Sequence, residues 1–158
     1  RCLKSQIINL DVYFLVVGEG TEFCKLEKFF NEQSPKNMKL MKRLPKEDYD
    51  RLVAACDIGM IFLNHRFTIP NFPSRLLSYM QAGIPIFAVT DSNTDIGKVI
   101  MNGGFGWWCE SNDMKMFNKK IKEICKSALG DMGEKAFLYL KENYSAMKSY
   151  EIIVNHFE

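Results

Sequence analysis

Two short loops carry the residue types and spacings that could bind a phosphate. The first is Gly18-Glu19-Gly20, which directly follows a continuous apolar run. In the second, Pro73 and Ser74 precede a short apolar segment that begins at Arg75. Serine is a favoured helix N-cap and proline is common at a helix start, so a helix should begin here. Its N-terminus would carry about half a positive charge and Arg75 a whole one, which suits a diphosphate without requiring a metal.

Each loop also has an ordinary structural interpretation. Glycines such as Gly18 and Gly20 allow backbone N–H groups to approach a phosphate or sugar, but they equally allow a tight strand-to-helix turn. The pattern is not G-x-G-x-x-G, because Phe23 and Cys24 occupy the region of the third glycine. The helix at Ser74 could likewise be a simple capped helix with a solvated arginine. The residues alone leave both alternatives open.

Other chemistry finds little support in the sequence. His65 and Arg66 lie in the long loop 64–73, where we interpret the lone histidine as a surface residue, and His156 lies near the end of the chain. No Ser/His/Asp set, paired acid motif or zinc-ligand spacing is present, so we assign no catalytic residue and no metal ligand. The five cysteines include Cys56 and Cys109 in apolar stretches, which favours buried thiols and a reducing compartment.

Apolar runs alternate with segments of helical periodicity along the chain, which predicts βαβ units and a mostly parallel sheet. The expected strands are 12–17, 38–41, 58–63, 85–89 and 106–109. The expected helices are 21–33, 46–56, 75–81, a short one through Ile100 capped by Thr94 or Asp95, 113–127, 130–142 and one from Ala146 to the end. Helices on both faces would give a Rossmann-like, three-layer α/β/α fold. Ligands in such sheets bind beyond the carboxyl ends of the strands, here at 18–20, 42–46 and 64–75.

Size and charge fit a single globular domain over residues 1–158. The formal net charge of +2 argues against a nucleic-acid partner, for which a dense basic face is typical. No apolar run of about 18 residues and no secretory signal is seen, so we expect a cytoplasmic location. The sequence opens at Arg1 in what looks like the middle of a helix, and we expect a fragment of a longer protein.

Five segments, in order and spacing, give the chain a family resemblance. They are Phe14 to Gly20, Leu40 to Leu44, Leu52 to Ile58, Pro73 to Pro85, and the glycines Gly104 and Gly106. Together they resemble the C-terminal half of GT-B glycosyltransferases of family 4, the retaining "glycosyl transferases group 1" type. The segment from Pro73 to Pro85 is similar to that family's "PSK…Y…A-G-x-P" stretch, and the resemblance covers nearly the whole chain.

The resemblance implies a nucleotide-sugar donor site, and a UDP-sugar is the donor we expect, with no metal or other cofactor. Gly18, Glu19 and Gly20 would approach the sugar or phosphates, and Arg43 and Leu44 would border the base. The residues implied for the diphosphate and sugar are Asn71, Phe72, Pro73, Ser74 and Arg75, with Ser78 near the ribose. The family's first strand of this domain and its acceptor domain would lie before Arg1. Contact with the inner face of a membrane through that missing domain stays open.

One departure from the family pattern concerns two carboxylates. Family members often carry Glu-x7-Glu across the helix, and the corresponding positions here are Pro70 and Ser78. A serine hydroxyl binds a ribose more weakly than a carboxylate does.

We therefore consider two hypotheses for the function of this chain. The first is the donor-binding part of a retaining hexosyltransferase of glycan synthesis (capsule, lipopolysaccharide or other polysaccharide), inactive as an isolated fragment. The second is a non-catalytic nucleotide-sugar-binding or interaction domain. A receiver-like signalling domain would need an acidic cluster that Gly18-Glu19-Gly20 does not supply.

Overall fold

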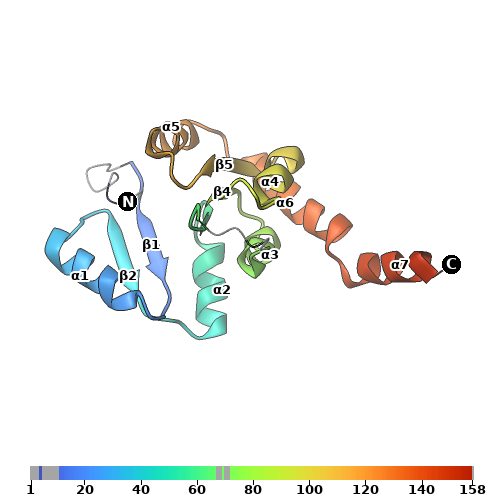
Figure 1. Cartoon of the computed structure of the whole chain (residues 1–158), viewed down its shortest axis with the longest axis horizontal. Helices are drawn as coiled ribbons and strands as arrows, with labels where there is room; N and C mark the ends of the chain where they lie inside the picture. The colour runs from blue at the N-terminus through green and yellow to red at the C-terminus, as the bar shows by residue number, and fades with distance from the viewer. Residues whose placement is uncertain (1–3, 5–10, 67–68, 70–71, 158) are drawn as a thin grey trace.

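A computed structural model describes residues 4, 11–66, 69 and 72–157 (Figure 1). Pro70 and Asn71 lie outside the described residues. The strands are β1 (Phe14–Val17), β2 (Met38–Met41), β3 (Gly59–Phe62), β4 (Ile86–Thr90) and β5 (Gly106–Glu110). The helices are α1 (Phe23–Gln33), α2 (Lys46–Ala54), α3 (Ser74–Gln81), α4 (Ile96–Gly103), α5 (Met114–Ile124), α6 (Gly130–Asn143) and α7 (Ala146–Phe157).

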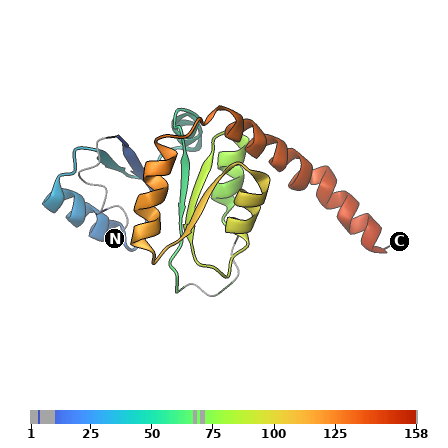
Figure 2. The same cartoon turned by 90° about the horizontal axis from the view of Figure 1, so that it is seen from above.

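Every pair of neighbouring strands among these residues is parallel. β1 pairs with β2, and β3, β4 and β5 pair in that order in a second sheet. The α/β class and the parallel pairing are therefore confirmed. The pairing is divided between two sheets, however, because no hydrogen-bonded ladder among the described residues joins β1 to β3. Figures 1 and 2 show the β1–β2 unit with α1 to one side of the larger sheet.

Two apolar cores cover the two faces of the β3–β5 sheet and give the expected layers. β4 lies at the centre and is buried at all five positions. On one face Ile86 and Ala88 pack with residues of α3, α4 and α6. On the other face Phe87 and Val89 pack with α5, where the ring of Phe117 stacks on Phe87 at a centroid distance of 5.6 Å.

The second core also holds the smaller sheet in place. Phe14 of β1 and Met38 of β2 are buried in the same cluster as Phe87 and Trp107. This burial is worth about 1.5–3 kcal/mol for each large apolar side chain, so it fixes β1 and β2 without a backbone ladder to β3.

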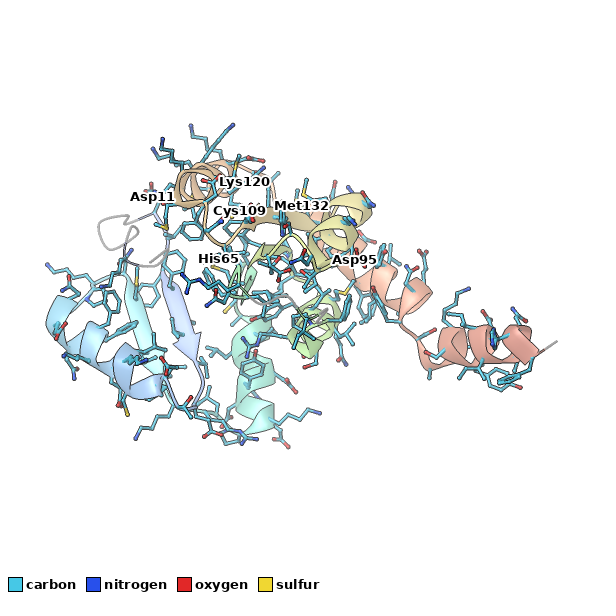
Figure 3. The ribbon with its side chains drawn as sticks, viewed as in Figure 1. Asp11, His65, Asp95, Cys109, Lys120 and Met132 are labelled. Carbon is cyan, nitrogen blue, oxygen red and sulfur yellow. The ribbon has the colours of Figure 1, made fainter. Side chains whose placement is uncertain are left out.

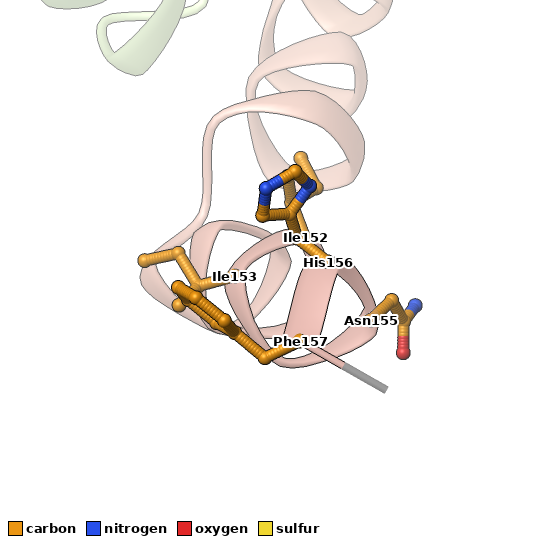
Figure 4. A pocket seen from close by; sticks show the side chains of 5 residues that line it. All are labelled: Ile152, Ile153, Asn155, His156 and Phe157. Atoms are coloured by element: carbon orange, nitrogen blue, oxygen red, sulfur yellow. The ribbon is translucent and has the colours of Figure 1, made fainter.

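The last helix, α7, projects away from the body of the molecule (Figures 1 and 2). The side chains of Ile152, Ile153 and Phe157 on this helix are 60%, 58% and 84% exposed. Together with Asn155 and His156 they line a shallow concavity of about 480 Å³ that α7 forms by itself (Figure 4). Within the described part of the chain, none of the helices has the length and apolar character needed to span a bilayer.

Candidate functional site

The loop after β1 has the geometry that its glycines predict. Gly18 continues the ladder, with its N–H donating to the Met41 carbonyl at 3.2 Å. Gly20 has φ +142°, a conformation that side chains disfavour, and its carbonyl accepts the N–H of Phe23 at 3.1 Å. A Cβ on either glycine would meet no described atom within 4 Å. The backbone of this loop is therefore turned tightly and left open on one side.

An ion pair joins this loop to the one after β2. Arg43 Nη1 donates to Glu19 Oε1 at 2.9 Å, and the two side chains are 74% and 62% exposed. The structure thus brings together two residues that the resemblance assigns to one site, although they are 24 positions apart. An exposed pair of this kind contributes only about 0–1 kcal/mol to stability, so a stronger anion could readily compete for Arg43.

The start of α3 differs from the expected cap. Pro73, with φ −62° and ψ 123°, is the N-cap residue, and Ser74 is the first helical residue. No side chain accepts a hydrogen bond at this end, so the prediction that Ser74 caps the helix is wrong. The reason is that Pro73 already supplies the extended backbone of the cap, and its carbonyl accepts the N–H of Leu76 at 2.9 Å.

The uncapped end is more open to an anion than the capped end would be. Ser74 and Arg75 are exposed, and the first turn contains no acidic residue. The first N–H groups of a helix lack the usual acceptor four residues earlier, and an anion can satisfy those that, unlike the Leu76 N–H, have no other acceptor. Arg75 is itself a residue of the first turn, so the start of α3 combines backbone donors with a positively charged side chain.

Arg75 also acts on a buried tyrosine one turn further along. Burial of the phenol raises the pKa of Tyr79, the neighbouring Tyr49 raises it further, and the Arg75 guanidinium lowers it. The Tyr79 hydroxyl donates to the Met60 carbonyl at 3.3 Å. Tyr79 therefore stays a neutral donor that ties α3 to β3.

The remaining predicted residues lie around this helix and the β2 loop. Phe72 is 41% exposed and its ring lies 5.3 Å from that of Tyr144, so it packs on the chain after α6. Ser78 and Leu44 are half-buried. In the described part of the chain, no hydrogen bond or ion pair connects Arg75 with Glu19 or Arg43. The structure therefore joins the loop after β1 to the loop after β2, and among the described residues it shows no bond from either loop to the start of α3.

A cleft of about 770 Å³, which the sequence patterns do not predict, lies at the carboxyl ends of β3 and β5, beside α1. Its described lining is Lys4, Lys25, Leu26, Phe29, Phe62, Leu63, Asn64, His65, Arg66, Ser111, Asn112 and Met114. These residues include four basic side chains and no acidic one. Figure 3 shows His65 between β1 and β4 in this view. His65 and Arg66 thus border a cleft, and Asn64 Oδ1 shapes their turn by accepting the Arg66 N–H at 3.0 Å.

A buried carboxylate after β4 was missed as well. Asp91 is 1% exposed, and its Oδ1 accepts the N–H groups of Asn93 and Thr94 at 2.8 and 3.0 Å. The expected side-chain cap at Thr94 or Asp95 does not form. Asp95 occupies the cap position of α4 but bonds Lys98 instead, at 3.2 Å. Asp91 shapes this turn because its short side chain reaches backbone donors two and three residues on.

Comparison with known proteins identifies the family. Residues 3–139 match the family described as "Glycosyl transferases group 1". This chain belongs to the group 1 glycosyltransferases. The glycosyltransferase domain is 30% identical over 143 residues to Probable glycosyltransferase WbjE of Pseudomonas aeruginosa, a match that covers 90% of this chain and 36% of WbjE.

Solved GT-B structures share the domain's fold. Anabaena Alr3699/HepE in complex with UDP superposes with a TM-score of 0.63 at 20% identity, covering 92% of this chain and 40% of HepE. The HepE complex with UDP-glucose gives the same TM-score at 18% identity. WaaG, a glycosyltransferase involved in lipopolysaccharide biosynthesis, gives 0.59 at 17% identity over 87% of this chain and 35% of WaaG. The chain therefore spans well under half the length of these relatives.

Proposed function

We propose that this domain binds the nucleoside-diphosphate sugar of a glycosyltransferase reaction. The observation that carries the proposal is the uncapped N-terminus of α3, where exposed Ser74 and Arg75 present donors with no acidic residue in the first turn. The family membership supports it, and the HepE structures with UDP and UDP-glucose support a UDP-sugar as the donor.

The chemistry would be the transfer of a hexose to a hydroxyl acceptor, with retention at the anomeric carbon. Negative charge grows on the diphosphate as the glycosidic bond breaks. The N–H groups at the start of α3 and the Arg75 guanidinium would stabilise that charge without a metal ion. Gly18 to Gly20 would leave room for the sugar, and Arg43 and Leu44 would border the base. We place Asn71, Pro73 and Ser78 in the same site.

The pathway and location are also proposals. The WaaG relation to lipopolysaccharide supports a role in bacterial glycan synthesis, such as capsule, lipopolysaccharide or another polysaccharide. A glycan or lipid-linked acceptor would be held by chain outside these 158 residues. A cytoplasmic protein that works at the inner face of the membrane fits such an acceptor.

Isothermal titration calorimetry with UDP, GDP and ADP tests the donor site. We expect UDP to bind best, and Arg75→Ala to weaken that binding by about 10- to 100-fold, the loss expected for one charge-assisted contact of about 1.5–3 kcal/mol. Arg51→Ala is the matched control, since Arg51 is an exposed arginine on α2 that only approaches Asp48, at 3.8 Å. A folded domain that binds none of the three nucleotides would contradict the proposal.

The second candidate is a non-catalytic nucleotide-sugar-binding or interaction domain, favoured by the loss of both family carboxylates at Pro70 and Ser78. Sugar transfer by the complete protein separates the two. If Arg75→Ala weakens nucleotide binding but leaves the rate of sugar transfer unchanged, this domain is not the catalytic donor site.

A further inference from the structure

The helix α5 has an apolar side and, opposite to it, a side made of lysines. Phe117, Ile121 and Ile124 are its buried residues, and they pack in the core between α5 and the β3–β5 sheet. Exposed lysines recur on the other side at intervals of four, three and four residues: Lys115, Lys119, Lys122 and Lys126. Because an α-helix has about 3.6 residues per turn, this spacing sets all four in one line, which we call the lysine stripe.

Lys126 continues the line although α5 ends at Ile124. The Cys125 N–H donates to the Ile121 carbonyl at 3.0 Å, as in a helix, and Cys125 keeps helical backbone angles. From Lys115 to Lys126 the stripe is therefore about 16 Å long, at a rise of about 1.5 Å per residue. Figure 1 shows α5 at the outer rim of the molecule, on the side away from α2.

The acidic residues of this segment do not balance the charge of the stripe. Residues 113–126 contain five lysines and two acidic residues, a net charge of +3, whereas the whole chain has +2. Glu123 accepts from the half-buried Lys120 at 2.9 Å, and Asp113 caps α5 by accepting the Met116 N–H at 2.8 Å. Both carboxylates are thus engaged away from the stripe. Among the described residues, none forms an ion pair with a stripe lysine.

The composition of the segment indicates what kind of anion the stripe suits. Lysines one turn apart repel one another and destabilise a helix, so the stability of the fold does not explain the stripe. Residues 113–126 contain no arginine, and their one aromatic residue, Phe117, is buried. Arginine binds single phosphates in a bidentate way and exposed rings stack on bases, so both are expected in a site for one phosphate group or for single-stranded nucleic acid. Lysines are flexible point charges, and a straight row of them fits a flat anionic surface.

We propose that the lysine stripe binds the surface of a bilayer that contains anionic lipids, with α5 lying parallel to that surface. Clusters of about four to eight basic residues on an amphipathic helix are typical of such contacts. The surface lies in this domain, and the proposal rests on the membrane location in the proposed function only for the choice of partner. It does not involve the donor site, since α3 and α5 pack on opposite faces of the β3–β5 sheet.

Co-sedimentation of the complete polypeptide with vesicles tests the proposal. One set of vesicles is phosphatidylcholine alone, and the other is phosphatidylcholine and phosphatidylglycerol in equal parts. We expect stronger binding to the anionic set, weakened by added salt. Changing all four stripe lysines to glutamine, which forms helices about as well as lysine, should lower the partition coefficient about 10-fold or more. The matched control changes four exposed lysines elsewhere to glutamine and should retain most of the binding: Lys28, Lys36, Lys135 and Lys141.

Cys125 gives a local measurement that needs no substitution. This thiol is exposed and free, and it is adjacent to Lys126. When the polypeptide is bound to anionic vesicles, we expect Cys125 to react with a water-soluble maleimide severalfold more slowly than it does in solution. Peptide mapping by mass spectrometry separates its labelling from that of the other cysteines.

Four results would overturn the proposal. The stripe variant could partition onto anionic vesicles as well as the unsubstituted polypeptide does. The control variant could lose as much binding, which would make net charge the cause. Cys125 could react at the same rate with and without vesicles. Binding that depends on the stripe could occur with duplex DNA and not with vesicles, which would assign the stripe to a nucleic acid.

Calorimetry with UDP on the same variants keeps this proposal separate from the donor site. A stripe variant that loses vesicle binding and keeps UDP binding supports the stripe and shows that the variant is folded. A polypeptide that binds vesicles through the stripe but binds no UDP also supports the stripe, and it contradicts the donor site alone.

Discussion

The ring of Tyr79 lies directly over Gly59, so that a Cβ on Gly59 would overlap the ring carbons. Gly59 opens β3 and Tyr79 lies on the buried face of α3. This contact sets how closely α3 approaches β3. It thereby fixes the position of the opposite end of the helix, where Ser74 and Arg75 present their donors.

Gly59→Ala should therefore destabilise the domain. Alanine fits the backbone, since Gly59 has no positive φ, but its methyl group would displace Tyr79 at a cost of about 1–3 kcal/mol. Urea denaturation measures the change. Gly130→Ala, where the added Cβ meets no described atom within 4 Å, is the control and should change the free energy of unfolding by less than about 1 kcal/mol. Equal midpoints for Gly59→Ala and the unsubstituted chain would contradict the packing argument.

Stability should fall at alkaline pH because of the same tyrosine. Burial raises the pKa of Tyr79 above its usual value, so the unfolded chain loses this proton first, near pH ~10. The neutral Tyr79 phenol therefore contributes fully to the free energy of unfolding below that pH, and this contribution is lost as the pH rises further. Tyr144, whose pKa is also raised by burial, acts in the same direction. Thermal unfolding from pH 8 to 11.5 should show a smaller alkaline loss for Tyr79→Phe. Identical profiles would exclude Tyr79 as the source.

The Glu19–Arg43 pair should matter for ligand binding and hardly at all for stability. Both side chains are more than half exposed, so Arg43→Ala should change the free energy of unfolding by less than about 1 kcal/mol. If Arg43 borders the nucleotide, the same change should weaken UDP binding severalfold in calorimetry. Lys98→Ala breaks a comparably exposed pair with Asp95 and serves as the control. A large stability loss with unchanged binding would make Arg43 a structural residue.

The thiols should differ in reactivity according to their surroundings. Cys24 and Cys125 are exposed and free, and should react first with a thiol reagent at pH 8. Burial, followed by the Asp57 carboxylate, raises the pKa of Cys56, so less thiolate is present and its reaction is slower. Cys109 is 1% exposed and should react only on unfolding. Peptide mapping by mass spectrometry gives the order, and early labelling of Cys109 would be inconsistent with the fold.

The spacing of apolar residues predicted the helices and strands because burial recurs with the period of each kind of element. The alternation of strands and helices was correct along the described chain, and β2 matches its expected bounds of 38–41. The ends of the helices were predicted less exactly, since helix caps depend on backbone geometry. The helix α4 continues to Gly103 instead of ending at Ile100, and α5 ends at Ile124 instead of at residue 127. Of the two cysteines expected to be buried, Cys109 is buried and Cys56 is half-buried.

The class of the fold and the parallel pairing could be predicted from the residues alone, because they follow from local patterns of apolar and glycine residues. The same patterns predicted three loops for ligand binding, and the three-dimensional packing settled how those loops meet. It paired Glu19 with Arg43, made Pro73 rather than Ser74 the cap of α3, placed His65 and Arg66 on a cleft and left β1 and β3 without a shared ladder. These features depend on contacts between distant segments, and no local periodicity encodes such contacts.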